Sequence, residues 1–135
     1  MNPILHEVFQ CSRYLTKELN LVLKEFDLYA SQWSVLYCVS HRKQMKLTDI
    51  WTYLNVEAPT VTRTANRLVE LGWLTIMPAQ DRREKIVTLS EEAVLKFPEI
   101  ETAIIRYTNR FLKGLTVAEQ EQLSVLLRKL QQGGE

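Results

Sequence analysis

The sequence predicts a mainly helical fold interrupted by one small β-hairpin. Apolar residues recur at helical spacing through most of the 135 residues. A short β-branched segment at about 73–89, split by a charged run, is the only clear strand signal. The chain has the length of one domain, and its 46% apolar content is enough for one core. We therefore expect residues 1–135 to form a single domain.

The first predicted helix spans residues 4–26, where apolar side chains follow a helical repeat. Ser31 is the expected N-cap of a second helix that runs toward His41, and the polar residues 41–46 are expected to form a loop. Thr48 is the expected cap of a third, short helix that ends near Asn55. These elements lead directly into the most informative part of the chain.

Residues 57–71 predict a fourth helix, with Pro59 in the first turn, where its missing N–H costs nothing. Gly72 is the expected C-terminal stop. Residues 73–77 and 86–89 are expected to pair as a two-stranded hairpin around the charged segment 78–85.

Two more helices are predicted after the hairpin. Ser90 is the candidate cap of a helix that extends to about Lys113, with Pro98 as a kink or a break. Residues 116–119 form a capping box, and the leucines that follow make a stripe like that of a coiled coil. Both this stripe and the first helix offer apolar surface to a partner.

Positive charge is concentrated in the middle of the chain. Residues 31–90 carry eight Lys and Arg against five Asp and Glu, whereas the segments on either side carry a small acidic excess. A basic segment of this kind is a footprint for phosphate.

Several classes of protein are not indicated. No long apolar run or signal peptide is seen, so we expect a cytoplasmic protein with no membrane partner. Cys11 and Cys38 form no CxxC pair and are expected to be buried thiols, and His6 and His41 lack partners at metal-ligand spacing. There is no glycine-rich phosphate loop, nucleophile elbow or carboxylate pair. We therefore expect no metal, no cofactor and no enzymatic activity.

The order of helix, turn, helix and basic hairpin is that of a winged helix-turn-helix, whose second helix enters the DNA major groove. The outer face of helix 57–71 carries side chains that suit bases and phosphates: Thr60, Thr62, Arg63, Asn66 and Arg67. An ordinary solvated helix can also look like this. The hairpin tip, residues 81–85, favours DNA because an arginine there can enter the minor groove while a nearby carboxylate orients it.

Several segments of the chain resemble the MarR family of bacterial transcription regulators. They are Leu47-Thr48, Ala58–Arg63, Leu68–Leu74, and Asp81–Arg83 with the following Ile86–Ser90. The resemblance covers essentially the whole chain, and its most specific part is Asp-x-Arg followed by an alternating strand and Leu-Ser. It implies a homodimer in which helices at about 3–26 and 91–132 interlock beside a winged core at about 31–90. It also implies a repressor that binds a pseudo-palindromic operator in double-stranded DNA.

The resemblance places minor-groove contact at Arg83, a steadying carboxylate at Asp81, and phosphate contacts at Gln32 and Thr48. The full set of expected DNA-binding residues is Gln32, Thr48, Pro59, Thr60, Thr62, Arg63, Asn66, Arg67, Asp81, Arg82, Arg83 and Lys85. Two positions depart from the family: Ile76 stands where a basic residue is usual, and Ala93 stands where a glycine is usual. The first departure puts a phosphate or wing-bracing contact in doubt.

In this family an effector often binds between the winged domain and the dimerisation helices. A small aromatic or phenolic effector is the expected ligand here, in a cleft lined by Tyr14, Phe26, Tyr29, Trp33 and Tyr37. The alternative is that these side chains belong to the core and the interface.

Two other functions stay open. One is a thiol-based redox-sensing regulator that uses Cys11, which lies three residues before Tyr14 and has only Arg13 as a nearby positive charge. The other is a winged-helix module for protein contacts, without specific DNA binding. Such a module has no need of a row of arginines on the second helix and the hairpin.

Overall fold

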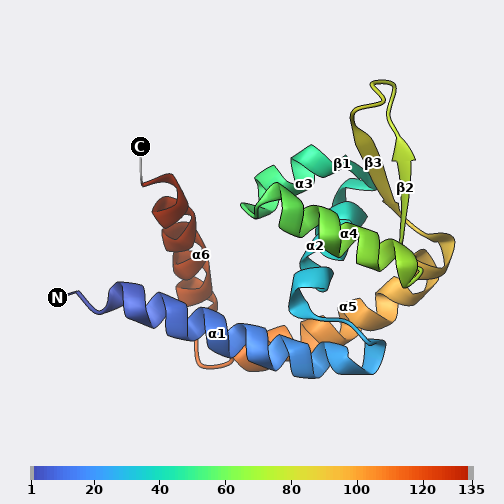
Figure 1. Ribbon diagram of the computed structural model, residues 1–135. Helices are drawn as coiled ribbons and strands as arrows, with labels where there is room; N and C mark the ends of the chain where they lie inside the picture. The colour runs from blue at the N-terminus through green and yellow to red at the C-terminus, as the bar shows by residue number, and fades with distance from the viewer. Residues whose placement is uncertain (1, 134–135) are drawn as a thin grey trace.

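The computed structural model, which describes residues 2–133, shows a winged unit flanked by long helices. In chain order the elements are α1 (Ile4–Leu23), a 3-10 turn η1 (Lys24–Phe26), α2 (Ala30–Arg42), β1 (Gln44–Lys46), α3 (Leu47–Leu54), α4 (Ala58–Glu70), β2 (Leu74–Pro78), β3 (Lys85–Leu89), α5 (Glu91–Leu112) and α6 (Val117–Gln132). Helices α1 and α5 lie side by side, the winged unit stands above one end of them, and α6 lies on the far side of the molecule from the hairpin (Figure 1). The predicted helical fold with a β-wing is confirmed.

The sheet has three antiparallel strands in the order β1-β3-β2, where the sequence predicted two. The predicted pair is present, with β2 and β3 in register from Leu74 opposite Leu89 to Pro78 opposite Lys85. The expected loop at 41–46 is wrong, because α2 continues to Arg42 and β1 then pairs along β3. A three-residue strand is too short to show alternation in the sequence.

Two predicted N-caps are wrong. Helix α2 begins at Ala30 with Tyr29 as its N-cap residue, and the Tyr29 N–H donates to Gln32 Oε1 at 2.9 Å. Helix α3 begins at Leu47, directly after β1, so Thr48 lies inside its first turn rather than at the cap. At α2 the Gln32 side chain bonds to the N-cap backbone where local sequence suggested a hydroxyl cap, whereas α3 has no side-chain cap hydrogen bond.

The caps predicted for the last two helices agree with the structure. Ser90 Oγ accepts the Ala93 N–H at 3.0 Å, and Thr116 with Glu119 forms the predicted capping box. Pro98 does not break α5, which runs unbroken through it.

The core lies between α2, α3, α4, the sheet and the neighbouring parts of α1 and α5. Its members are buried apolar side chains: Leu23, Leu28, Trp33, Val35, Leu36, Cys38, Val39, Met45, Ile50, Val61, Ala65, Leu68, Leu74, Val87, Phe97 and Ile100. Because α4 contributes three of them from one face, its opposite face is held in a fixed orientation toward solvent.

We predict that Ser90→Ala lowers the free energy of unfolding by about 1 kcal/mol. The hydroxyl group both accepts the Ala93 N–H and donates to the Gly72 carbonyl at 2.7 Å, so it ties the end of α4 to the start of α5. Urea unfolding measures the change. Ser124→Ala, an exposed position inside α6, is the matched control and should lose little stability. Equal losses in the two variants would contradict the capping role.

Candidate nucleic-acid interface

The turn between α3 and α4 sets the angle of the helix pair. Asn55 adopts a left-handed conformation with φ of 55°, which asparagine tolerates better than most residues. The Val56 N–H then donates to the Trp51 carbonyl at 3.1 Å, and Glu57 is the extended N-cap residue of α4. The first turn of α4 therefore emerges from a short, hydrogen-bonded connection.

The outer face of α4 is open to solvent. Val61, Ala65 and Leu68 are buried on one side, whereas the polar residues that the sequence predicted lie on the other. Of these, Pro59, Thr60, Arg63, Asn66 and Arg67 are exposed and Thr62 is half-buried. The result is a face of hydroxyl, amide and guanidinium groups on a helix whose back is fixed in the core.

The two arginines of this face differ in their surroundings. Arg67 Nη1 pairs with Glu70 Oε2 at 2.9 Å, one turn further along the same helix. Arg63 makes no ion pair with any residue in the range 2–133. The Arg63 guanidinium group can therefore bind an external acceptor directly. Arg67 can do so only after its ion pair with Glu70 is broken.

The wing tip presents three further cations. Asp81 Oδ1 accepts the Arg83 N–H at 3.1 Å and the Arg83 Nε–H at 3.4 Å, while the Arg83 side chain stays 91% exposed. Arg82 and Lys85 are exposed beside it. The carboxylate that the sequence predicted to steady this arginine is therefore in contact with it, and the arginine side chain remains almost fully exposed to solvent.

Sequence reasoning missed an ion pair between β1 and the wing tip. Lys46 Nζ lies 2.8 Å from Glu84 Oε2, although the two residues are far apart in the chain. The contact depends on β1, which the sequence did not reveal. The two expected phosphate contacts lie at helix starts. Gln32 is half-buried and its side-chain oxygen accepts the Tyr29 N–H, and Thr48 is half-buried in α3.

The predicted aromatic cleft is not one cluster in the single chain. Trp33 stacks on Phe97, with ring centroids 5.1 Å apart, and also contacts Tyr37. Tyr14 instead lies against Phe111 of α5, and Tyr29 is exposed at the start of α2.

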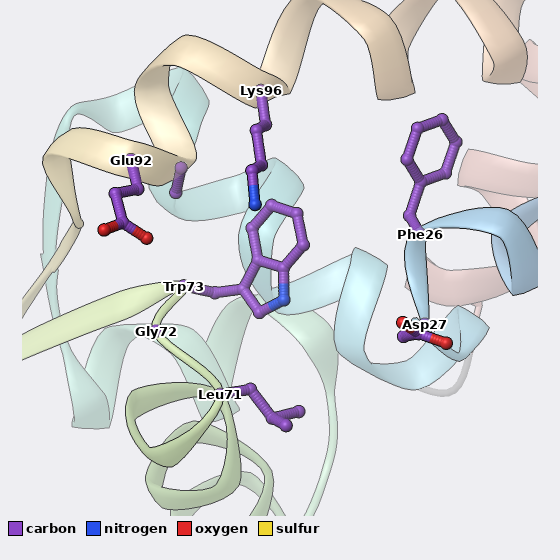
Figure 2. A pocket seen from close by; sticks show the side chains of 8 residues that line it. Phe26, Asp27, Leu71, Gly72, Trp73, Glu92 and Lys96 are labelled. Carbon is purple, nitrogen blue, oxygen red and sulfur yellow. The ribbon is translucent and has the colours of Figure 1, made fainter.

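Several cavities adjoin α4, and two of them involve residues near its C-terminal end. One, of about 190 Å³, lies between η1, the end of α4 and α5; in Figure 2 the Lys96 ammonium group reaches toward the Trp73 ring, and Nζ is 5.8 Å from the ring centroid. Phe26 lines it as well, but so do the carboxylates Asp27 and Glu92. Sequence analysis did not single out Lys96, and it placed Trp73 only in the family-like segment 68–74 and the predicted strand 73–77, not at a ligand site.

The second cavity is larger, at about 550 Å³, and lies between α1, α2 and α4. It is lined by Tyr29, Gln32 and Arg67, so it joins one predicted effector residue to two predicted DNA-binding residues. Tyr14, Trp33 and Tyr37 do not line it. A molecule bound in it would touch α4 itself.

The two cysteines differ. Cys38 is buried as predicted, its thiol donates to the Val35 carbonyl at 3.2 Å, and burial raises its pKa. The expectation that Cys11 is buried is wrong for the single chain, in which it is exposed. The reason is that only the C-terminal part of α1 is covered by the rest of the chain, so Leu23 is its one buried residue.

Among residues 2–133, no three or more His, Cys, Asp or Glu side chains are grouped so that they could hold a metal ion. No helix in the same range combines the length and the apolar character that a membrane span requires.

A helix pair with a fixed inner face and a polar outer face, next to a hairpin tipped with arginine, defines a winged helix-turn-helix protein. The sequence pattern of the MarR family matches residues 28–85. The HTH-type transcriptional regulator YwoH of Bacillus subtilis is 42% identical over 125 residues, which cover 93% of this chain and 91% of that protein. The chain belongs to the MarR family, whose members are transcriptional regulators rather than enzymes.

Other similar proteins agree with this placement. The transcriptional repressor IacR of Pseudomonas putida is 25% identical over 113 residues, covering 83% of this chain and 68% of IacR. A mutant MarR from E. coli complexed with operator DNA has a TM-score of 0.87 at 24% identity and covers 95% of this chain and 93% of its own. A MarR protein from Peptoclostridium difficile has a TM-score of 0.89 at 21% identity, covering 98% and 87%. These structures share the fold.

Proposed function

We propose that this protein is a homodimeric, sequence-specific DNA-binding repressor that acts on a pseudo-palindromic operator in the bacterial cytoplasm. The observation that carries the proposal is the wing tip, where Arg83 is held by Asp81 and still almost fully exposed. A carboxylate that orients an exposed guanidinium group has little use in a solvated loop, because an exposed ion pair adds little stability. It has a clear use when the guanidinium group must enter a narrow groove.

The two cationic elements perform different tasks. The outer face of α4 enters the major groove, where Arg63 can pair bidentately with guanine and Asn66 can pair with adenine. Arg83 enters the neighbouring minor groove, where the negative potential is strongest. Arg82 and Lys85 add phosphate contacts, which strengthen binding to any sequence.

The dimer follows from surface that the single chain leaves uncovered. Helix α1 exposes Ile4, Leu5, Val8 and Phe9, and α6 has no buried residue at all. Exposed apolar stripes on two helices at one end of a molecule are typical of an interface. Two copies joined there would present two α4 helices to the two halves of an operator.

We propose that a small aromatic or phenolic effector releases the operator by binding in the cavity between α1, α2 and α4. A ligand there contacts Arg67 of the recognition helix as well as Tyr29. It weakens DNA binding only to the extent that it prefers an arrangement of the two winged units that does not fit the operator.

The test is a fluorescence anisotropy titration of the full chain against labelled DNA from upstream of its own gene and against a scrambled duplex, each at two salt concentrations. Tighter binding to the native DNA that persists at the higher salt supports a specific regulator. Equal and steeply salt-dependent binding to both duplexes would mean nonspecific attraction to phosphate. No binding to either duplex would favour the protein-interaction module.

A further inference from the structure

The ion pair between Lys46 and Glu84 joins the helix pair to the wing. Lys46 is the last residue of β1 and the N-cap residue of α3, so its backbone is continuous with the helix-turn-helix. Glu84 directly precedes β3 at the end of the wing tip. Their charged atoms lie 2.8 Å apart.

Strand register explains why these two side chains meet. Lys46 lies opposite Ile86 in the antiparallel pair of β1 and β3. Glu84 lies just outside β3, two residues before Ile86, which makes it the diagonal neighbour of Lys46 and places the two long side chains within reach of each other. The other neighbour of β3 cannot offer the same contact, because β2 has the sequence LTIMP and carries no charge.

Glu84 is also part of the tip that holds Arg83. The Glu84 N–H donates to the Asp81 carbonyl at 2.9 Å, and the Glu84 carbonyl accepts the Ala79 N–H at 3.0 Å. Asp81 in turn accepts from Arg83 through its side chain. A continuous series of polar contacts therefore runs from the start of α3 to the exposed guanidinium group.

We propose that Glu84 is a positioning residue for DNA binding: by pairing with Lys46 it fixes the wing relative to the helix pair and so aims Arg83. This inference rests on the proposed function. No atom of Glu84 needs to touch DNA. Glu84 contacts Lys46 through its side chain and Asp81 through its backbone N–H, and these two contacts together hold Arg83 in position.

The sign of the effect separates this role from simple electrostatics. A carboxylate in the wing repels DNA phosphates, so electrostatics alone predicts that its removal strengthens binding. A positioning role predicts the opposite. The pair is partly exposed, with side-chain exposures of 47% for Lys46 and 33% for Glu84, so the loss should be modest. The hydrogen bond and the charge of Glu84 raise the pKa of Lys46, as expected for an ion pair.

The experiment measures operator affinity by fluorescence anisotropy for the full chain. We expect Glu84→Gln to weaken binding by about three- to fivefold, as the loss of one partly exposed pair allows. Glu99→Gln, which removes the same charge from the exposed face of α5, is the matched control and should not weaken binding. Lys46→Glu alone should also weaken binding, and adding Glu84→Lys should restore it by re-forming the pair in reverse.

A double-mutant cycle tests whether Glu84 acts through Arg83. In an Arg83→Ala background, Glu84→Gln should no longer weaken binding, because there is no guanidinium group left to aim. Equal weakening in both backgrounds, tighter binding by Glu84→Gln, or no restoration by the reversed pair would each overturn the proposal. Arg83→Ala alone tests the proposed function. If this variant bound operator as tightly as the unmodified chain, the wing would have no part in DNA binding, and the proposed function would fail together with the positioning role of Glu84.

Discussion

Replacing Leu126 and Leu130 of α6 with aspartate is expected to give a folded monomer whose operator affinity is lower by about 10²–10⁴-fold. The two side chains are 48% and 61% exposed in the single chain, so they contribute little to its own core. Their substitution should therefore leave the winged unit intact. Placed against the apolar side chains of a second copy, the two carboxylates would instead be buried without partners, which a dimer cannot tolerate.

The large loss of affinity follows from the geometry of two linked sites. In a dimer, binding of one winged unit holds the second near its half-site, so the second contact forms at a high effective concentration. A monomer keeps only one set of contacts. The substitutions change no residue of α4 or the wing, so any loss reports the dimer and not the DNA-binding surface.

Sedimentation velocity at micromolar concentration, followed by titration of the operator, measures both effects. Leu95→Asp is the matched control, because Leu95 is an 80% exposed leucine on α5, outside the α1 and α6 stripes. It should stay dimeric and bind normally. A monomeric unmodified chain, or a double variant that remains a dimer with full affinity, would contradict this role of α6.

The parts of this fold that the sequence predicted are those with local signals. Helix α4 was predictable because Val61, Ala65 and Leu68 recur at helical spacing and Gly72 follows with a φ of +86°. The start of α5 was predictable because a single hydroxyl group, that of Ser90, forms its cap. The wing contact between Asp81 and Arg83 spans two residues, so it too was local.

The parts that the sequence did not predict depend on distant residues. Strand β1 exists because Met45 pairs with Val87, and nothing in three residues of sequence indicates that partner. The Lys46–Glu84 pair depends on the same register. The sequence analysis expected several aromatic side chains to line one cleft. In the structure Trp33 stacks on Phe97 in the core, whereas Tyr14 packs on α5. Only the tertiary arrangement separates them.

Arg83→Ala is expected to weaken operator binding by about 1–3 kcal/mol while leaving the dimer intact. The side chain is 91% exposed and its only close polar partner among residues 2–133 is Asp81, so its loss should not disturb folding. The loss of affinity has two sources: the guanidinium group no longer enters the minor groove, and Asp81 is left without a partner beside the DNA phosphates.

A matched variant distinguishes the wing from net charge. Arg106→Ala removes the same charge from an exposed position on α5, outside the helix-turn-helix and the wing, and should bind operator with nearly normal affinity. Arg83→Lys keeps the charge but not the planar, weakly hydrated group that suits a narrow groove, so it should recover only part of the loss. Full recovery by lysine would mean that Arg83 acts as a general phosphate contact. Normal binding by Arg83→Ala would remove the wing from the interface.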